Sequence, residues 1–148
     1  MDYNGNQNFI SPIALADADT LTGSYATDNA VCIIDTKDIN ELTLFIFYTM
    51  GADETSNSIQ IKIDTAQSDL AVDSVLWARE TAIVTVNGTS THTQVEHSFA
   101  ATQAAATYDV FPIHLVDINA YRIRVSAKET GIAVNGGTFY LLAVTKGQ

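Results

Sequence analysis

Short runs of apolar and β-branched residues alternate with turn clusters along most of this chain. Clusters of Gly, Asn, Asp and Ser separate the runs at the spacing of roughly 8–12 residues that is typical of β-sandwiches and barrels. No stretch has the apolar periodicity of a long amphipathic helix. The pattern therefore predicts an all-β protein. The predicted strands cover residues 13–16, 21–27, 31–35, 42–48, 59–63, 77–86, 108–115, 121–125 and 138–144.

The strongest predicted strand covers residues 42–48, which are rich in β-branched and aromatic side chains. Its second half is apolar on both faces, and this predicts a central strand that is covered on both sides. Ile59, Ile61 and Ile63 alternate with polar residues, as in a strand with one buried and one exposed face. A polar turn cluster separates the two segments, so we expect them to form a β-hairpin.

The middle of the chain carries two local signals of strand position. Asn87-Gly88 follows the β-prone run 82–86 and predicts a tight hairpin turn. Residues 89–99 then expose at least one polar face, and the Ala-rich segment 100–107 is either one helical turn or a loop of small residues. Pro112 cannot donate a ladder hydrogen bond, which predicts an edge strand or a bulge there.

The number of runs, together with a short internal repeat, indicates the connectivity. About ten runs exceed the seven strands of an immunoglobulin-like domain, so we favour an antiparallel β-sandwich that is jelly-roll-like, although periodicity alone does not separate the two. Asp38-Ile39-Asn40 and Asp117-Ile118-Asn119 precede strands at the same offset. We interpret them as a repeated corner in which Asp and Asn cap the backbone and Ile enters the core. Two equivalent Greek-key halves would explain the repeat, and coincidence is the competing interpretation.

Composition divides the chain into an N-terminal arm and one domain. Residues 1–12 are rich in Asn and Gln and end in Phe9-Ile10-Ser11-Pro12, which predicts an extended arm anchored by its apolar residues. Residues 13–148 form a single β-sandwich domain of ordinary size. Phe9 and Ile10 are expected to attach the arm either to this domain or to a neighbour.

Charge and cysteine content exclude several classes of protein. Hydrophobic residues make up 47% of the 148 residues, which is too many for intrinsic disorder. The formal charge of −10 argues against binding of nucleic acid through its phosphates. A single cysteine, Cys32, excludes a disulfide scaffold or a thiolate zinc cluster, and its apolar neighbours predict a buried side chain. The N-terminus has neither a basic nor an apolar signal region, and no run could span a membrane, so we expect assembly in a cytoplasm.

No motif for catalysis or for cofactor binding is present. The sequence lacks a Gly-x-Ser-x-Gly elbow, a phosphate-binding loop and a dinucleotide fingerprint. His92 and His97 would face opposite sides of one strand, and His114 is expected at a sheet rim, so we predict no metal site. We therefore predict no catalytic residue and no cofactor.

Two weaker candidates for binding have simpler explanations. Asp17 and Asp19 precede Gly23 and offer calcium ligands, but no complete calcium loop is present and a solvated turn explains them. Trp77 is a candidate for stacking against a glycan, but its apolar neighbours favour a core or half-buried position.

The low charge content bears on how the surface is used. Charged residues make up only 16% of the chain, so few lysines are present to protect the edges of sheets from pairing. A weakly charged β-domain of this kind is suited to wide, neutral contacts with other proteins. We therefore expect self-association or docking on a larger assembly.

The chain resembles the small, acidic β-sandwich virion proteins of tailed bacteriophages that decorate capsids or sit on necks and tails. The resemblance covers most of residues 20–146. The segments that carry it are IDTKDINELTL (34–44), YTMG (48–51), SIQIKI (58–63), VDINAYRIRV (116–125) and GTFYL (137–141). It implies a non-enzymatic capsid decoration or auxiliary protein in the virion, a homo-oligomeric or capsid-bound state, and an arm that reaches a neighbour.

The major capsid protein or another virion protein is the partner that this resemblance implies. We expect Phe9, Ile10 and Ile13 to be the docking anchors, and no contact with nucleic acid or membrane. A structural component of the tail or neck is a close alternative. A carbohydrate-binding or adhesion module is the second hypothesis, and an enzyme is the third.

Overall fold

The computed structural model describes residues 7–13, 20–25, 31–70, 76–132 and 135–147, with side chains described between residues 20 and 144 of these ranges. The described residues are all-β, as predicted, and none lies in a helix that could cross a membrane. The strands are β1 (Gln7–Ile13), β2 (Val31–Asp35), β3 (Ile39–Thr49), β4 (Ser58–Ala66), β5 (Trp77–Arg79), β6 (Thr81–Val86), β7 (Thr89–Gln94), β8 (His97–Ala100), β9 (Asp109–Leu115), β10 (Arg122–Thr130) and β11 (Thr138–Gly147).

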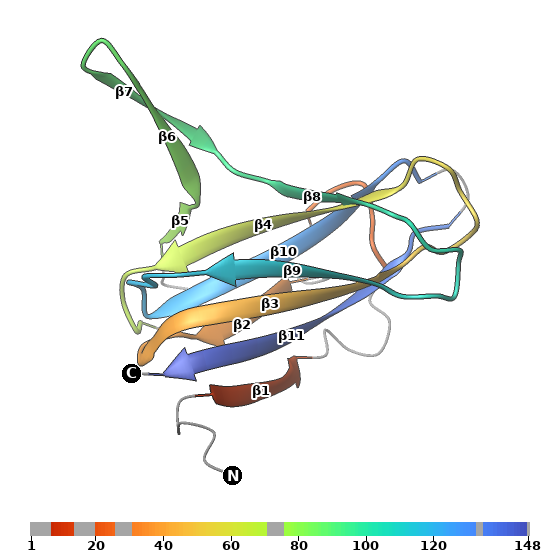
Figure 1. Ribbon diagram of the computed structural model, residues 1–148, viewed down its shortest axis with the longest axis horizontal. Helices are drawn as coiled ribbons and strands as arrows, with labels where there is room; N and C mark the ends of the chain where they lie inside the picture. The colour runs from red at the N-terminus through yellow and green to blue at the C-terminus, as the bar shows by residue number, and fades with distance from the viewer. Residues whose placement is uncertain (1–6, 14–19, 26–30, 71–75, 133–134, 148) are drawn as a thin grey trace.

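Two antiparallel sheets form the body of the molecule, and a separate hairpin projects from it (Figure 1). The first sheet has the strand order β1-β11-β3-β9. The second has the order β2-β10-β4-β5, and β8 pairs with the same edge of β4 as β5 does. Strands that are neighbours in a sheet are mostly distant in the sequence, so each sheet is built from both halves of the chain.

A single apolar core lies between the two sheets. Leu44 and Ile46 of β3 face it from the first sheet, and Ile61 of β4 and Val125 of β10 face it from the second, each with no exposed surface. The alternation predicted for residues 59–63 is therefore confirmed, with every second side chain buried. Burying one full face of each sheet in this way supplies the main stabilising free energy of the fold.

The predicted hairpin between residues 42–48 and 59–63 is wrong. β3 pairs with β11 and β9 in the first sheet, whereas β4 pairs with β10 in the second, so the connection crosses from one sheet to the other. The physical reason is the core. In opposite sheets, the buried faces of the two strands pack against each other across the core. As a hairpin, both strands would lie in one sheet and their buried side chains would point from the same face of that sheet.

Other local predictions are confirmed. Asn87 and Gly88 have φ angles of 50° and 78°, which are the left-handed values that a two-residue hairpin turn requires. Pro112 lies in β9, the edge strand of the first sheet. In the Ala-rich segment 100–107, Ala100 ends β8 and the remaining residues form a loop. The buried carboxylate of Asp109, the first residue of β9, accepts hydrogen bonds from the Thr102 and Gln103 amides at 2.9 and 3.2 Å.

The N-terminal predictions fall partly outside the described residues. Residues 7–12 of the predicted arm lie with Ile13 in β1, which pairs with β11 at the edge of the first sheet. Residues 14–16, 26 and 27 of two predicted strands are outside the described ranges, as are Asp17 and Asp19. The described segment 20–25 is not a strand, but the Leu21 amide donates to the Gly137 carbonyl at 2.7 Å and the Glu129 amide donates to the Thr22 carbonyl at 2.9 Å.

Glu129 of β10 is fully buried between the sheets and joins three parts of the chain. Its Oε1 accepts hydrogen bonds from the Tyr48 hydroxyl on β3 and from Asn57 Nδ2 at 2.9 Å. Its Oε2 accepts from the Gly137 amide, immediately before β11, at 2.5 Å. Burial, followed by the Glu129 carboxylate, raises the pKa of Tyr48 well above the ordinary phenol value. Gly137 has no room for a side chain, because a Cβ would lie 2.3 Å from the Thr49 carbonyl oxygen.

Replacing this carboxylate by an amide is expected to weaken the fold. In Glu129→Gln the new NH₂ group faces either the Gly137 amide or the Tyr48 and Asn57 donors, so at least one buried donor loses its acceptor. We expect a loss of about 1–3 kcal/mol of unfolding free energy in urea titrations. The exposed Asp38→Asn variant makes the same chemical change and should stay within about 0.5 kcal/mol of wild type. Equal stability of the two variants would contradict the role of Glu129.

Candidate functional site

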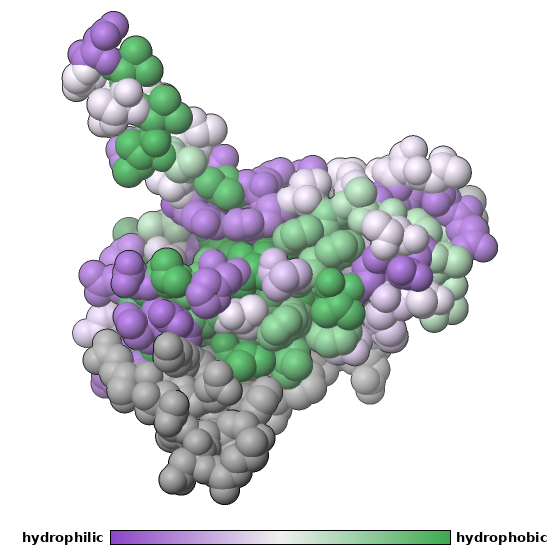
Figure 2. All heavy atoms as spheres, in the orientation of Figure 1, coloured by the Kyte–Doolittle hydropathy of each residue, from purple (hydrophilic) through white to green (hydrophobic). Residues whose placement is uncertain are grey.

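The outer face of the first sheet is apolar and uncharged over most of its area. We define the outer face as the outward residues of β3 from Thr43 to Thr49, of β9 from Val110 to His114 and of β11 from Thr138 to Val144. It includes Phe45, Phe47, Pro112, Tyr140 and Leu142 and no Asp, Glu, Lys or Arg. Figure 2 shows hydrophobic side chains gathered over these strands.

Aromatic rings organise one end of the outer face. The Phe47 and Tyr140 rings stack with centroids 4.4 Å apart, and the Tyr108 ring meets Tyr140 edge-on at 5.3 Å. Val110 beside them is 48% exposed. The prediction that residues 42–48 are covered on both sides is therefore only half right. The core covers one side of β3, and within the described residues the other side is screened by neighbouring side chains instead of by a further layer.

The docking anchors predicted from the sequence lie next to this face. The strand register places Phe9 opposite Val144, Ile10 opposite Ala143 and Ile13 opposite Leu141. The three residues belong to the edge strand of the same sheet. Their side chains are outside the described part of the chain, so their role as anchors stays a prediction.

The two Asp-Ile-Asn corners meet at one end of the molecule. The Ile118 amide donates to the Asn40 carbonyl at 3.1 Å, and Ile39 and Ile118 both pack against the core, as the repeat predicted. The corners differ in backbone conformation. Ile39 already begins β3, whereas Asp117 adopts a left-handed φ of 52° in the turn before β10.

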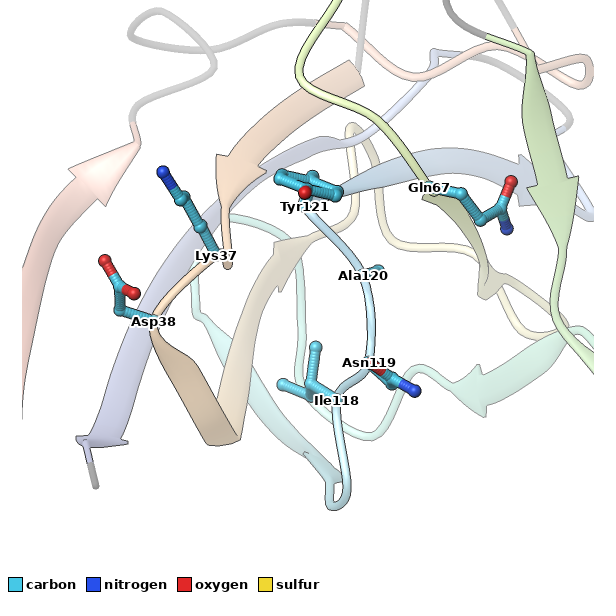
Figure 3. A pocket seen from close by; sticks show the side chains of 7 residues that line it. All are labelled: Lys37, Asp38, Gln67, Ile118, Asn119, Ala120 and Tyr121. Carbon is cyan, nitrogen blue, oxygen red and sulfur yellow. The ribbon is translucent and has the colours of Figure 1, made fainter.

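An open pocket of about 550 Å³ lies at these corners (Figure 3). Three separate segments line it: the turn before β3, the end of β4, and the segment that leads into β10. Tyr121 contributes a partly exposed ring. The other lining residues are Lys37, Asp38, Gln67, Ile118, Asn119 and Ala120. The sequence offered no signal for this pocket, because its polar residues are scattered and each alone resembles an ordinary turn residue.

Several polar side chains of the pocket are not paired within the described part of the chain. The side chains of Lys37, Asp38, Gln67, Asn119 and Tyr121 bond to no other described residue. One ammonium, one carboxylate, two amides and a phenol supply both donors and acceptors with no net charge. An open cavity of this size and lining is chemically suited to a neutral ligand that carries several hydroxyl groups.

The outer face of the second sheet carries a cluster of positively charged side chains. Five of the seven Lys and Arg residues of this acidic chain lie on β4, β5 and β10, namely Lys62, Arg79, Arg122, Arg124 and Lys128. The Tyr25 ring covers three of them, with Lys62 Nζ and Lys128 Nζ at 4.8 and 4.7 Å from its centroid and Arg79 Cζ at 5.9 Å. Burial and the Glu96 carboxylate raise the pKa of Tyr25 above the ordinary phenol value.

Trp77, the candidate for glycan stacking, belongs to this charged network. The Arg124 guanidinium lies 4.6 Å from the centre of the Trp77 ring and also pairs with the buried Asp64 carboxylate at 2.8 Å. One face of the ring is therefore occupied by the protein itself. Tyr121, in the corner pocket, is a better placed aromatic ring for a ligand.

The three histidines lie apart from one another. His97 lies on β8, and its Nε2 contacts Glu80 Oε2 at 2.9 Å. His92 lies on β7. His114 lies on the edge strand β9, and its Nδ1 contacts the Thr43 hydroxyl at 2.9 Å. The rim position predicted for His114 is confirmed. In the described ranges, no three His, Cys, Asp or Glu side chains are grouped closely enough to hold a metal ion.

Cys32 is buried in β2, as predicted, and burial raises the pKa of its thiol to about 12. The protonated thiol is thus favoured by folding. The contribution of the buried, protonated thiol to the free energy of unfolding is complete below the ordinary thiol pKa of about 8.5. It is lost as the pH rises toward the raised pKa of the folded protein.

We expect Cys32 to react with a thiol reagent such as dithionitrobenzoate at pH 8 only when the protein unfolds. The reaction rate should be far below that of the urea-unfolded chain and should rise with urea along the unfolding transition. Rapid stoichiometric labelling of the native protein would show instead that the thiol is accessible.

Comparison with known proteins gives no match at a significant level. No family model matches the chain, and the same holds for curated proteins and for solved structures. The surfaces and the pocket described above are therefore the basis on which a function is assigned.

Proposed function

We propose that this chain is a non-enzymatic virion structural protein, a capsid decoration or auxiliary protein that binds the phage particle through neutral β-surface. The observation that carries the proposal is the outer face of β3, β9 and β11. Three features support a docking role: the face lies on one side of a sheet, it has aromatic rings at one end, and it has no charged side chain. An exposed apolar patch of this kind is typical of a surface that contacts another protein.

We infer further that the two sheets form a jelly-roll sandwich. β5 and β8 pair with successive parts of the same edge of β4, so they can be read as one strand position interrupted by the β6-β7 hairpin. The chain then visits eight strand positions. Successive positions lie in opposite sheets except for positions 4 and 5, which are neighbours in the second sheet, and the orders are 1-8-3-6 and 2-7-4-5. This agrees with the eight-stranded, double-sheet arrangement that occurs in viral capsid domains and in lectins. The fold-level likeness is an analogy and leaves the function to the surface.

Charge matters for the choice of partner. A chain with a net charge of −10 is repelled by other acidic surfaces, and an uncharged contact area removes the local part of that repulsion. The major capsid protein or another virion protein is the partner that we propose. Phe9, Ile10 and Ile13 on the neighbouring β1 would extend the contact along the same edge of the sheet.

A charge placed in the outer face should abolish docking without unfolding the protein. Val110→Glu puts a carboxylate on a half-exposed position of β9, and we expect binding to particles lacking this protein to fall at least about tenfold in co-sedimentation. Thr55→Glu adds the same charge to an exposed loop residue outside the defined outer face and should bind like wild type. Absence of the protein from purified particles, or unchanged binding of Val110→Glu, would refute the proposal.

A glycan-binding role is the second candidate, and the corner pocket is the observation that favours it. Tyr121 offers a ring, and the amides of Gln67 and Asn119 offer paired donors and acceptors. We expect weak binding on an array of neutral oligosaccharides, reduced at least about tenfold by Tyr121→Ala because the stacking surface is lost. Tyr108→Ala, at an exposed tyrosine elsewhere, is the matched control. An array without any bound glycan would eliminate this role and leave the docking proposal untouched.

A further inference from the structure

The β6-β7 hairpin projects from the body with every residue of both strands exposed (Figure 1). Ile83, Val84 and Val86 are 61%, 58% and 61% exposed, although apolar side chains of this size are usually buried in a folded domain. A hairpin of two strands alone is at best marginally stable in water. An exposed apolar hairpin therefore indicates that a further contact covers it.

The hairpin is locally specified. Its two strands pair from Thr81–Gln94 to Val86–Thr89 without a bulge, and the Asn87-Gly88 turn has the left-handed angles it needs. The hydroxyl groups of Thr85 and Ser90 bond across the strands at 2.9 Å. Register and conformation are thus determined before any partner binds.

The base of the hairpin is clamped to the second sheet. Arg79 donates from Nε and Nη2 to the Val95 carbonyl at 3.3 and 3.0 Å, and the Val95 amide donates to the Glu80 carbonyl at 3.0 Å. The Glu80 side chain in turn contacts His97 Nε2 at 2.9 Å. These contacts fix the point at which the hairpin leaves the body.

The open edge of β6 has none of the features that normally prevent strand pairing. Proteins protect edge strands with charged residues, prolines or bulges. Residues 81–94 contain no Asp, Glu, Lys, Arg or Pro, and their register has no bulge. The edge of β6 is bordered by Ile83, Val84 and Val86, whereas β7 carries only Thr, Ser, His and Gln. Pairing is therefore favoured on the β6 side.

We propose that β6 of one copy pairs antiparallel with β6 of a second copy across a two-fold axis, so that the two hairpins form one four-stranded sheet. An antiparallel pair of identical strands is self-complementary, as a two-fold interface requires. Charge favours this site for contact between copies. Each copy carries −10, and the projecting, uncharged hairpins meet while the acidic bodies stay apart. This inference is independent of the virion proposal.

The hydrogen-bond pattern of the hairpin indicates which residues would make the contact. In a two-residue hairpin the pair that closes the turn is hydrogen bonded, and bonded pairs then alternate along the ladder. With Val86 and Thr89 as the closing pair, the backbone groups of Ile83 and Thr85 point away from β7 to the open edge. On β7 the corresponding outward residues are Ser90 and His92.

The test compares two proline variants at cross-strand partners. Thr85→Pro and Ser90→Pro each add one ring and remove the same Thr85–Ser90 hydroxyl bond, and neither removes a bond of the hairpin ladder. They differ only in which edge they block. In analytical ultracentrifugation without particles, we expect wild type and Ser90→Pro to dimerise, and Thr85→Pro to have a dissociation constant raised at least about tenfold.

Hydrogen exchange keeps the test decisive if either proline weakens the hairpin itself. In the wild-type protein, the amides of Ile83 and Thr85 should become protected as concentration rises, and those of Ser90 and His92 should not. In ultracentrifugation, a wild-type protein that stays monomeric at all concentrations would overturn the proposal, as would equal dimerisation of the two variants or a loss of dimerisation confined to Ser90→Pro. In hydrogen exchange, amide protection that does not depend on protein concentration would overturn it as well. None of these results would alter the expected binding of Val110→Glu to particles.

Discussion

The buried carboxylate of Glu129 is the interaction on which the arrangement of the two sheets depends. It lies on the second sheet and accepts hydrogen bonds from Tyr48 on the first, from Asn57 in the crossing between β3 and β4, and from the amide of Gly137. A buried carboxylate is stable only when its oxygens are satisfied, and this packing brings all three donors to it from separate parts of the chain. The apolar core supplies most of the stabilising free energy, and Glu129 selects one relative placement of the strands.

That placement also determines which surfaces remain open. Both sheets turn one face to the core, but their other faces differ in chemistry. The second sheet carries most of the positive charge of the chain. Asp64 pairs with Arg124, Glu96 pairs with Arg79 and Lys128, and the Tyr25 ring lies against three of these five cations. On the first sheet, the outer face defined above carries aromatic and aliphatic residues and no Asp, Glu, Lys or Arg. The two outer faces therefore differ: the side chains of the second sheet contact one another, and the outer face of the first sheet presents apolar side chains.

The local features of the fold could be predicted because neighbouring residues determine them. The Asn87-Gly88 turn needs left-handed backbone at two positions, Pro112 cannot donate a ladder bond, and the alternation at Ile59, Ile61 and Ile63 follows from one-sided burial. The pairing of β3 could not be predicted in this way. β3 and β4 are both apolar on the core side and are joined by a loop, and the loop permits either a hairpin or a crossing between sheets.

The sequence by itself determined the all-β class, most of the strands, the tight hairpin, the edge position of β9 and the burial of Cys32, since each depends on residues close in the chain. Only the tertiary structure decided that β3 belongs to β11 and β9, that Arg124 covers the Trp77 ring, and that Lys37, Gln67 and Tyr121 line one pocket. These facts depend on segments brought together from distant parts of the chain. The reason is that the two sheets form by pairing strands across the whole sequence, so the neighbours of a side chain are set by the core and by the buried polar network that orders it.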